Sequence, residues 1–181
     1  MSDDELVEQI QLGNENAAAE LIERHYVSVL RYCRWHCSRL EEAEDLTQET
    51  FLKLFKSIPK YKGKGKFKTY LYTIANHLCI DEGRKVRLYP LEDEENLARG
   101  GLAQRGLMQE SDGIHRLEDQ DEIRYLLKTL SPEQREAVIL RFDEQLSFAE
   151  IAKVMGCNIR TAQSRVRWAL KNMRKGKHDD R

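Results

Sequence analysis

The sequence has few residues that break helices and few alternating patterns that indicate strands. Its 181 residues include only three prolines, at positions 59, 90 and 132, and each lies at a boundary rather than inside a periodic run. Alternating valine and threonine, which would indicate strands, is scarce. Apolar residues instead recur at helical spacings of three and four. The chain is therefore predicted to be all-α, with two small helical domains.

The sequence also lacks a long apolar run and a signal peptide. No run reaches the ~20 apolar residues that a membrane-spanning helix needs. The first residues, MSDDE, are acidic where a signal peptide would be basic and then apolar. We therefore expect a cytoplasmic protein with no membrane insertion, and its four cysteines are expected to be free thiols.

Catalytic and cofactor signatures are absent as well. There is no glycine-rich phosphate loop, nucleophile elbow or paired-histidine motif, and the five histidines are scattered. Cys33 and Cys37 share a helix face, but structural zinc needs four ligands and no others are evident nearby. The sequence predicts core cysteines, no metal, no cofactor and no enzymatic activity. It does not decide whether Cys33 and Cys37 have a redox or metal role.

What the chain does contain is sharply segregated charge. Residues 53–87 hold ten Lys and Arg against two acids, a net charge of +8. Residues 158–178 hold seven basic residues and no acid, a net charge of +7. Between them, residues 88–122 hold ten acids against three Arg, a net charge of −7. Two basic blocks around an acidic connector are typical of a protein that binds a polyanion at two places.

Periodicity and turn signals divide the chain into a helical domain at 1–87, a linker at 88–120 and a second helical domain at 121–181. In the first domain, short helices around residues 6–10 and 17–22 are separated at Gly13-Asn14, and further helices are expected at 26–40, at 43–58 and from about residue 67. The linker lacks helical periodicity and is rich in glycine and acids. In the second domain, Ser131 and Ser147 begin capping boxes.

The second domain contains the pattern of a helix-turn-helix. Gly156 is suited to end one helix, and Asn158 is suited to cap the next. Ile151, Ala152, Met155, Ile159, Ala162 and Val166 are expected to pack the two helices together. The amino-terminal half of a second helix of this kind enters the major groove. The candidate base and phosphate contacts are Arg160, Thr161, Gln163, Ser164, Arg165, Arg167 and Lys171.

Two surfaces of the first domain are candidate binding sites. The helix at 43–58 has an apolar stripe and, on its other side, a mixed acidic and apolar face made of Asp45, Gln48, Glu49 and Leu52. The segment that follows combines lysines with aromatic rings, on which unpaired bases stack. In the helix that begins near residue 67, the expected core stripe contains Phe67, Tyr70, Leu71, Ile74, Ala75 and Leu78. The expected outer face contains Thr69, Tyr72, Thr73, Asn76 and His77. The candidate DNA contacts are Tyr61, Lys62, Lys64, Lys66, Tyr72, Thr73, Asn76, His77, Arg84 and Lys85.

These motifs resemble the extracytoplasmic-function, or group 4, sigma factors of bacterial RNA polymerase. Residues 43–51 (AEDLTQETF) are similar to region 2.2 of that family, residues 65–77 (GKFKTYLYTIANH) to regions 2.3–2.4, and residues 130–136 (LSPEQRE) with the following helix-turn-helix to region 4. The resemblance covers nearly the whole chain except the linker. Tyr70 stands where the family usually has Trp, and Gln163 where Lys is common.

The resemblance implies a set of partners and roles. Asp45, Gln48, Glu49 and Leu52 would contact the β′ clamp helices of core RNA polymerase, and region 4 would meet the β flap. The loop at 61–66 and Asn76 would handle the −10 strand of promoter DNA, region 4 would recognise the −35 element, and the linker would thread toward the RNA exit channel. An anti-sigma factor is the family's usual regulator.

Two other classes of protein fit parts of the pattern. A conventional duplex-binding regulator would combine the helix-turn-helix with a sensor or oligomerisation domain and would bind an operator without polymerase. A site-specific recombinase or nuclease would need a catalytic serine or a carboxylate–metal cluster, and neither is apparent.

Overall fold

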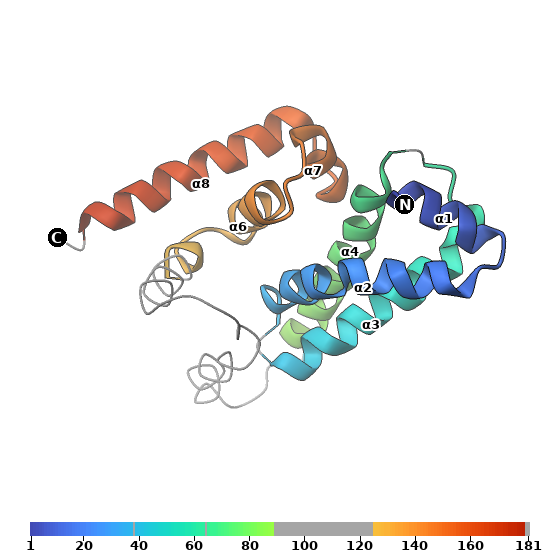
Figure 1. The fold of residues 1–181 in the computed structure, drawn as a ribbon. Coiled ribbons are helices and arrows are strands. Elements are labelled where there is room, and N and C mark those ends of the chain that lie inside the picture. The colour runs from blue at the N-terminus through green and yellow to red at the C-terminus, as the bar shows by residue number, and fades with distance from the viewer. Residues whose placement is uncertain (38, 64, 89–124, 180–181) are drawn as a thin grey trace, which may run out of the picture. The chain divides into compact units, whose positions relative to one another are not determined.

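The computed structural model describes residues 1–37, 39–63, 65–88 and 125–179, with side chains described up to residue 83 and from 125 to 175. All regular secondary structure in these ranges is helical, as Figure 1 shows, which confirms the all-α prediction. The chain forms two compact units, one within Met1–Gln104 and the other within Arg105–Arg181. Residues 89–120 of the predicted linker lie outside the described ranges.

The first unit contains helices α1 (Asp3–Gln11), α2 (Glu15–Arg34), α3 (Leu40–Ser57) and α4 (Phe67–Leu88), with a 3₁₀ turn η1 (Ile58–Lys60) after α3. The predicted break at Gly13-Asn14 is confirmed: Gly13 has φ +88° and the Asn14 side chain accepts from the backbone N–H of Asn16. The predicted break between residues 22 and 26 is wrong. Neither glycine nor proline occurs there, so α2 continues to Arg34.

The core of the first unit is formed by the apolar stripes of all four helices. Leu6, Leu21, Val29, Leu54 and Leu71 are completely buried. Cys33 on α2 and Cys79 on α4 are also buried free thiols, with their Sγ atoms 4.0 Å apart. Packing of this kind, rather than the intrinsic propensity of any one helix, supplies most of a helical domain's stability.

Helix α4 is rotated about its axis relative to the sequence prediction. Thr69, Tyr72 and Asn76, expected on the outer face, are 1%, 0% and 3% exposed. Tyr70 and Ile74, expected in the core, are half-buried. The Tyr72 ring packs edge-on against Tyr32 of α2, with ring centroids 5.1 Å apart. The side of α4 that carries Thr69, Tyr72 and Asn76 therefore packs in the core. The outer stripe of the helix runs through residues 70, 73, 74, 77 and 80.

The second unit contains α6 (Pro132–Val138), a π-helical turn η4 (Ile139–Asp143), α7 (Phe148–Val154) and α8 (Ile159–Asp179). The predicted caps are confirmed, since the Ser131 and Ser147 side chains accept from the backbone N–H groups of Gln134 and Glu150. Gly156 has φ +62°, and Asn158 accepts from the N–H of Thr161 at 2.7 Å. These contacts fix the turn between α7 and α8.

Candidate functional site

The acidic and apolar face predicted on α3 is exposed. Asp45, Gln48 and Glu49 are all exposed, and Leu52 keeps 59% of its surface open to solvent. Glu49 forms an ion pair with Lys53 at 3.2 Å, and both side chains are about half exposed. On the other side of the helix, Leu46, Phe51 and Leu54 are buried. Packing of that stripe therefore orients the four predicted residues outward, with a large apolar side chain among polar ones.

The loop after α3 holds part of the second candidate surface. We call residues 61–66 the basic loop. Lys62 and Lys66 are exposed, whereas Tyr61 is half-buried and its ring packs on Tyr70, with centroids 4.7 Å apart. Burial, with the negative charge of Asp4 and then Tyr70, raises the pKa of Tyr61 to about 12, so its hydroxyl stays protonated at neutral pH.

Two candidate DNA residues on α4 do not reach the surface in this structure. Tyr72 and Asn76 are buried for the reason given above, so their predicted exposure is wrong. Thr73 is half-buried and His77 is exposed, on the same outer stripe as Tyr70. Lys64 and the side chains of Arg84 and Lys85 lie outside the described residues.

Helix α8 presents the third candidate surface. Arg160, Gln163, Arg167 and Lys171 are exposed, and Thr161, Ser164 and Arg165 are half-buried. The buried stripe contains Ala162, Val166 and Ala169, together with Ile151 and Ala152 of α7. Ile159, expected to pack between the helices, is instead 49% exposed at the first position of α8. The exposed residues recur at spacings of three and four, which gives one continuous basic face.

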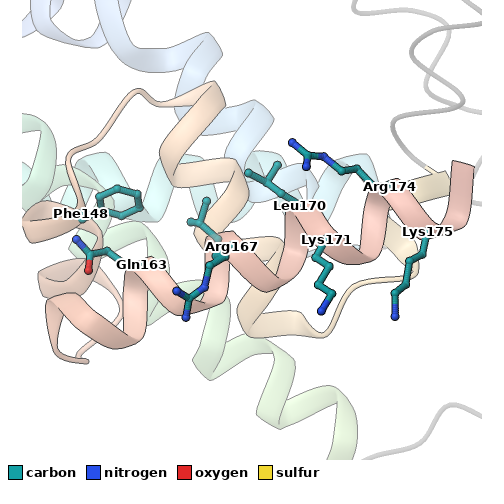
Figure 2. Close-up of a pocket in the computed structure, with 8 residues that line it drawn as sticks. Phe148, Gln163, Arg167, Leu170, Lys171, Arg174 and Lys175 are labelled. Atoms are coloured by element: carbon teal, nitrogen blue, oxygen red, sulfur yellow. The ribbon is translucent and has the colours of Figure 1, made fainter.

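An open groove follows this face of α8. Phe148, Val166 and Leu170 contribute apolar surface, while Gln163 and four basic residues, Arg167, Lys171, Arg174 and Lys175, form the rest of the lining. Arg167, Lys171 and Lys175 project side by side in Figure 2. Such a row of cations is suited to successive phosphates of a nucleic acid backbone.

One exposed aromatic residue on α8 is missing from the predicted set. Trp168 is 48% exposed, and the ammonium group of Lys171 lies 4.7 Å from the centre of its ring. Its position four residues after Ser164 and three before Lys171 places it along the edge of the basic face. Helical spacing from the predicted contacts was the signal that could have identified it.

The cysteines show no arrangement for a metal. Among the side chains that the structure describes, no three or more His, Cys, Asp or Glu could hold an ion together. Burial raises the pKa of the Cys37 thiol to about 12, which keeps it protonated and unreactive at neutral pH. None of the described helices is both long and apolar enough to cross a membrane.

Family models match both units. The model for Sigma-70 region 2 matches residues 21–88, and the model for Sigma-70, region 4 matches residues 120–173. The ECF RNA polymerase sigma factor SigC of Mycobacterium tuberculosis (strain CDC 1551 / Oshkosh) is 34% identical over 173 residues, which cover 91% of this chain and 88% of SigC. SigW of Bacillus subtilis, also an ECF RNA polymerase sigma factor, is 26% identical over 179 residues, with 96% and 95% covered.

Solved structures show the same fold. CnrH, in complex with the cytosolic domain of CnrY, aligns with a TM-score of 0.71 at 21% identity, over 99% of each chain. The sigma factor RpoE, in complex with the anti-sigma factor NepR from Bartonella quintana, aligns with a TM-score of 0.66 at 25% identity, over 90% of this chain and 98% of RpoE.

Proposed function

This chain belongs to the extracytoplasmic-function sigma factors of the sigma-70 family, and we propose a role in transcription for each of its exposed surfaces. It acts in the cytoplasm as a non-catalytic specificity subunit that binds core RNA polymerase and directs it to promoters. Residues 1–87 form the region 2 domain, residues 88–120 form the linker toward the RNA exit channel, and residues 121–181 form the region 4 domain.

The exposed face of α3 docks on the β′ clamp helices. The observation that supports this most directly is Leu52, 59% exposed, on the same helix face as Asp45, Gln48 and Glu49. An isolated exposed leucine needs no explanation. Here, however, Leu52 lies among two carboxylates and an amide, as in a protein interface whose apolar centre is surrounded by a polar rim. A duplex-binding regulator with the same helix-turn-helix would not need this face.

The basic loop and the outer stripe of α4 handle the −10 element. Lys62 and Lys66 supply positive charge. The sequence predicts Lys64, Arg84 and Lys85 as further phosphate contacts. Tyr61 and Tyr70 offer a ring pair, and Thr73 and His77 lie on the outer stripe of α4. Unpaired bases stack on aromatic rings while cations hold the backbone, so this combination fits strand capture.

Helix α8 recognises the −35 element in the major groove. Arg160 and Gln163 are exposed near its amino terminus, where side chains of a recognition helix contact bases. Arg167, Lys171, Arg174 and Lys175 contact phosphates. The same domain contacts the β flap of the polymerase. We further propose regulation by an anti-sigma factor, since the similar RpoE is found with one.

The test is co-elution with core polymerase on a sizing column, run beside a duplex-DNA binding assay without polymerase. We expect stoichiometric co-elution and weak free DNA binding for the wild-type chain. The double variant Asp45→Lys/Gln48→Ala should lose co-elution and promoter-specific transcription while its helical circular dichroism spectrum is unchanged. Glu23→Lys, which reverses an exposed carboxylate on α2, is the matched control and should behave as wild type.

The competing class predicts a different outcome. A conventional regulator would bind a specific duplex tightly by itself, with affinity that falls steeply with salt, and would not bind core. That result, or full activity of the double variant, would contradict the docking surface proposed for α3.

A further inference from the structure

Helix α1 contacts the basic loop through two hydrogen bonds and the η1 turn just before it through a third. The side-chain amide of Gln11 donates from Nε2 to the carbonyl of Ile58 at 2.8 Å and to the carbonyl of Tyr61 at 3.0 Å. The Asp4 carboxylate accepts from the backbone N–H of Gly65. Gln11 thus holds the start of the loop and Asp4 holds its end, and Figure 1 shows α1 beside this connection between α3 and α4.

Helix α1 is itself fixed to the rest of the unit. Asp3 accepts from Arg24 of α2 at 2.8 Å and lies 2.9 Å from the ring Nε2 of His25. Leu6 and Val7 are 0% and 3% exposed, so the apolar side of α1 belongs to the core. The helix is therefore a firm support, and the bonds from Asp4 and Gln11 transmit that support to the loop.

The basic loop has little internal means of keeping one conformation. It contains two glycines, of which Gly65 has φ +66°, and glycine loses the most backbone freedom on ordering. Lys62 and Lys66 are exposed cations of the same sign, and their repulsion does not favour a compact loop. Internal order comes from Tyr61, whose ring packs on Tyr70. Gly63 lies close against the same ring, since a Cβ at this position would be 2.6 Å from the Tyr61 hydroxyl oxygen. The backbone carbonyl of this same tyrosine accepts the hydrogen bond from Gln11 Nε2.

We infer that α1 is a brace that preorganises the basic loop for capture of single-stranded promoter DNA, with Gln11 and Asp4 as positioning residues. The inference rests on the −10 role proposed above for the loop. Neither residue is suited to bind the strand directly. Asp4 is an anion that would repel phosphate, and both Gln11 hydrogen bonds from Nε2 go to backbone carbonyls. Because they order the loop beforehand, they reduce the conformational entropy that the loop loses when DNA binds.

The first test measures the brace without DNA or polymerase. Hydrogen–deuterium exchange of the backbone amides at 61–66 is compared between the wild-type chain and Gln11→Ala. Removing the amide donor should accelerate exchange in the loop at least fivefold, while exchange in the buried part of α2 stays unchanged. Glu8→Gln, an exposed substitution on α1, is the control and should leave the loop as in wild type. Equal loop exchange in Gln11→Ala and wild type would overturn the brace.

The second test measures what the brace does for promoter opening. The probe is a promoter fragment that the wild-type holoenzyme selects from a randomised DNA library, and opening is followed by permanganate reactivity of unpaired thymines. Gln11→Ala should reduce opening about five- to tenfold and weaken base preference in the −10 element, with co-elution with core unchanged. A support for the fold alone would lower core binding and opening together.

The outcomes separate the two proposals. If wild-type chain neither binds core nor opens any promoter, the proposed function fails and the inference about DNA capture fails with it, whatever the exchange experiment shows. If wild type opens the promoter and Gln11→Ala opens it equally well, the proposed function stands and the brace is refuted. Asp4→Ala, which removes the side-chain acceptor for the Gly65 N–H, should reproduce the effect of Gln11→Ala in both tests.

Discussion

Replacing Leu52 by alanine isolates the apolar part of the proposed docking face. Alanine is the strongest helix former and Leu52 is 59% exposed, so the substitution should leave α3 and the stability of the unit nearly unchanged. It removes the only large apolar side chain among the four docking residues. Any loss of affinity for core polymerase then measures the contact that this side chain makes in the complex.

The exposed fraction of Leu52 sets the size of that loss. Complete burial of a leucine side chain is worth about 1.5–3 kcal/mol. Since 59% of the Leu52 surface is still open, covering it with a partner should contribute about 1–2 kcal/mol. A change of that size raises Kd roughly 5- to 30-fold.

Fluorescence anisotropy of the labelled chain, titrated with core polymerase, gives the Kd. Val27→Ala is the matched control, because Val27 is an apolar residue of α2 with 68% exposure and no assigned partner surface. Val27→Ala should bind core as wild type does. An unchanged Kd for Leu52→Ala, or an equal loss for Val27→Ala, would refute the assignment of this face to the polymerase.

Two further predictions concern α8 and α2. Gln163→Ala should relax −35 preference at one base by about 1–3 kcal/mol, measured by binding to single-base variants of the selected promoter, and an unaltered profile would mean that Gln163 does not face a base. Burial lowers the pKa of His25, against partial opposition from Asp3, so the folded state takes up a proton less readily than the unfolded state. Its stability contribution is complete above the unfolded pKa near 6.5 and is lost as pH falls through the lower folded pKa. The free energy of unfolding, measured with urea, should therefore fall more between pH 7.5 and pH 5 in wild type than in His25→Gln. An equal fall in both proteins would show that His25 does not titrate in this way.

Local chemistry explains the parts of the fold that the sequence predicts well. Ser131, Ser147 and Asn158 cap helices through bonds to residues three positions away, and Gly156 adopts a left-handed conformation that few other residues tolerate. These signals are complete within a few residues of sequence. Likewise, the Asp45 to Leu52 face could be predicted because the other side of α3 has one clear apolar stripe.

The rotation of α4 could not be predicted in this way, because apolar and aromatic residues occur all round its amino-terminal half. Tyr70, Leu71, Tyr72 and Ile74 all suit a core, so periodicity alone does not select the buried side. The choice depends on Tyr32 of α2, whose ring receives Tyr72, and this partner lies forty residues away in sequence. Asn76 is buried on the same side at 3% exposure, a position that composition would not assign to an amide.

The packing that buries Tyr72 also connects the proposed functions of the first unit. Helix α3 buries Leu54 while it exposes Leu52, and α4 buries Leu71 and Tyr72 while it exposes the stripe that includes His77. Because α3 and α4 share one close-packed core, neither can rotate about its axis without opening a cavity or creating overlap. A polymerase that holds the outer face of α3 therefore also fixes the orientation of the α4 stripe. Substitutions inside this core should impair docking and opening together, whereas Leu52→Ala should act on docking and Gln11→Ala on opening.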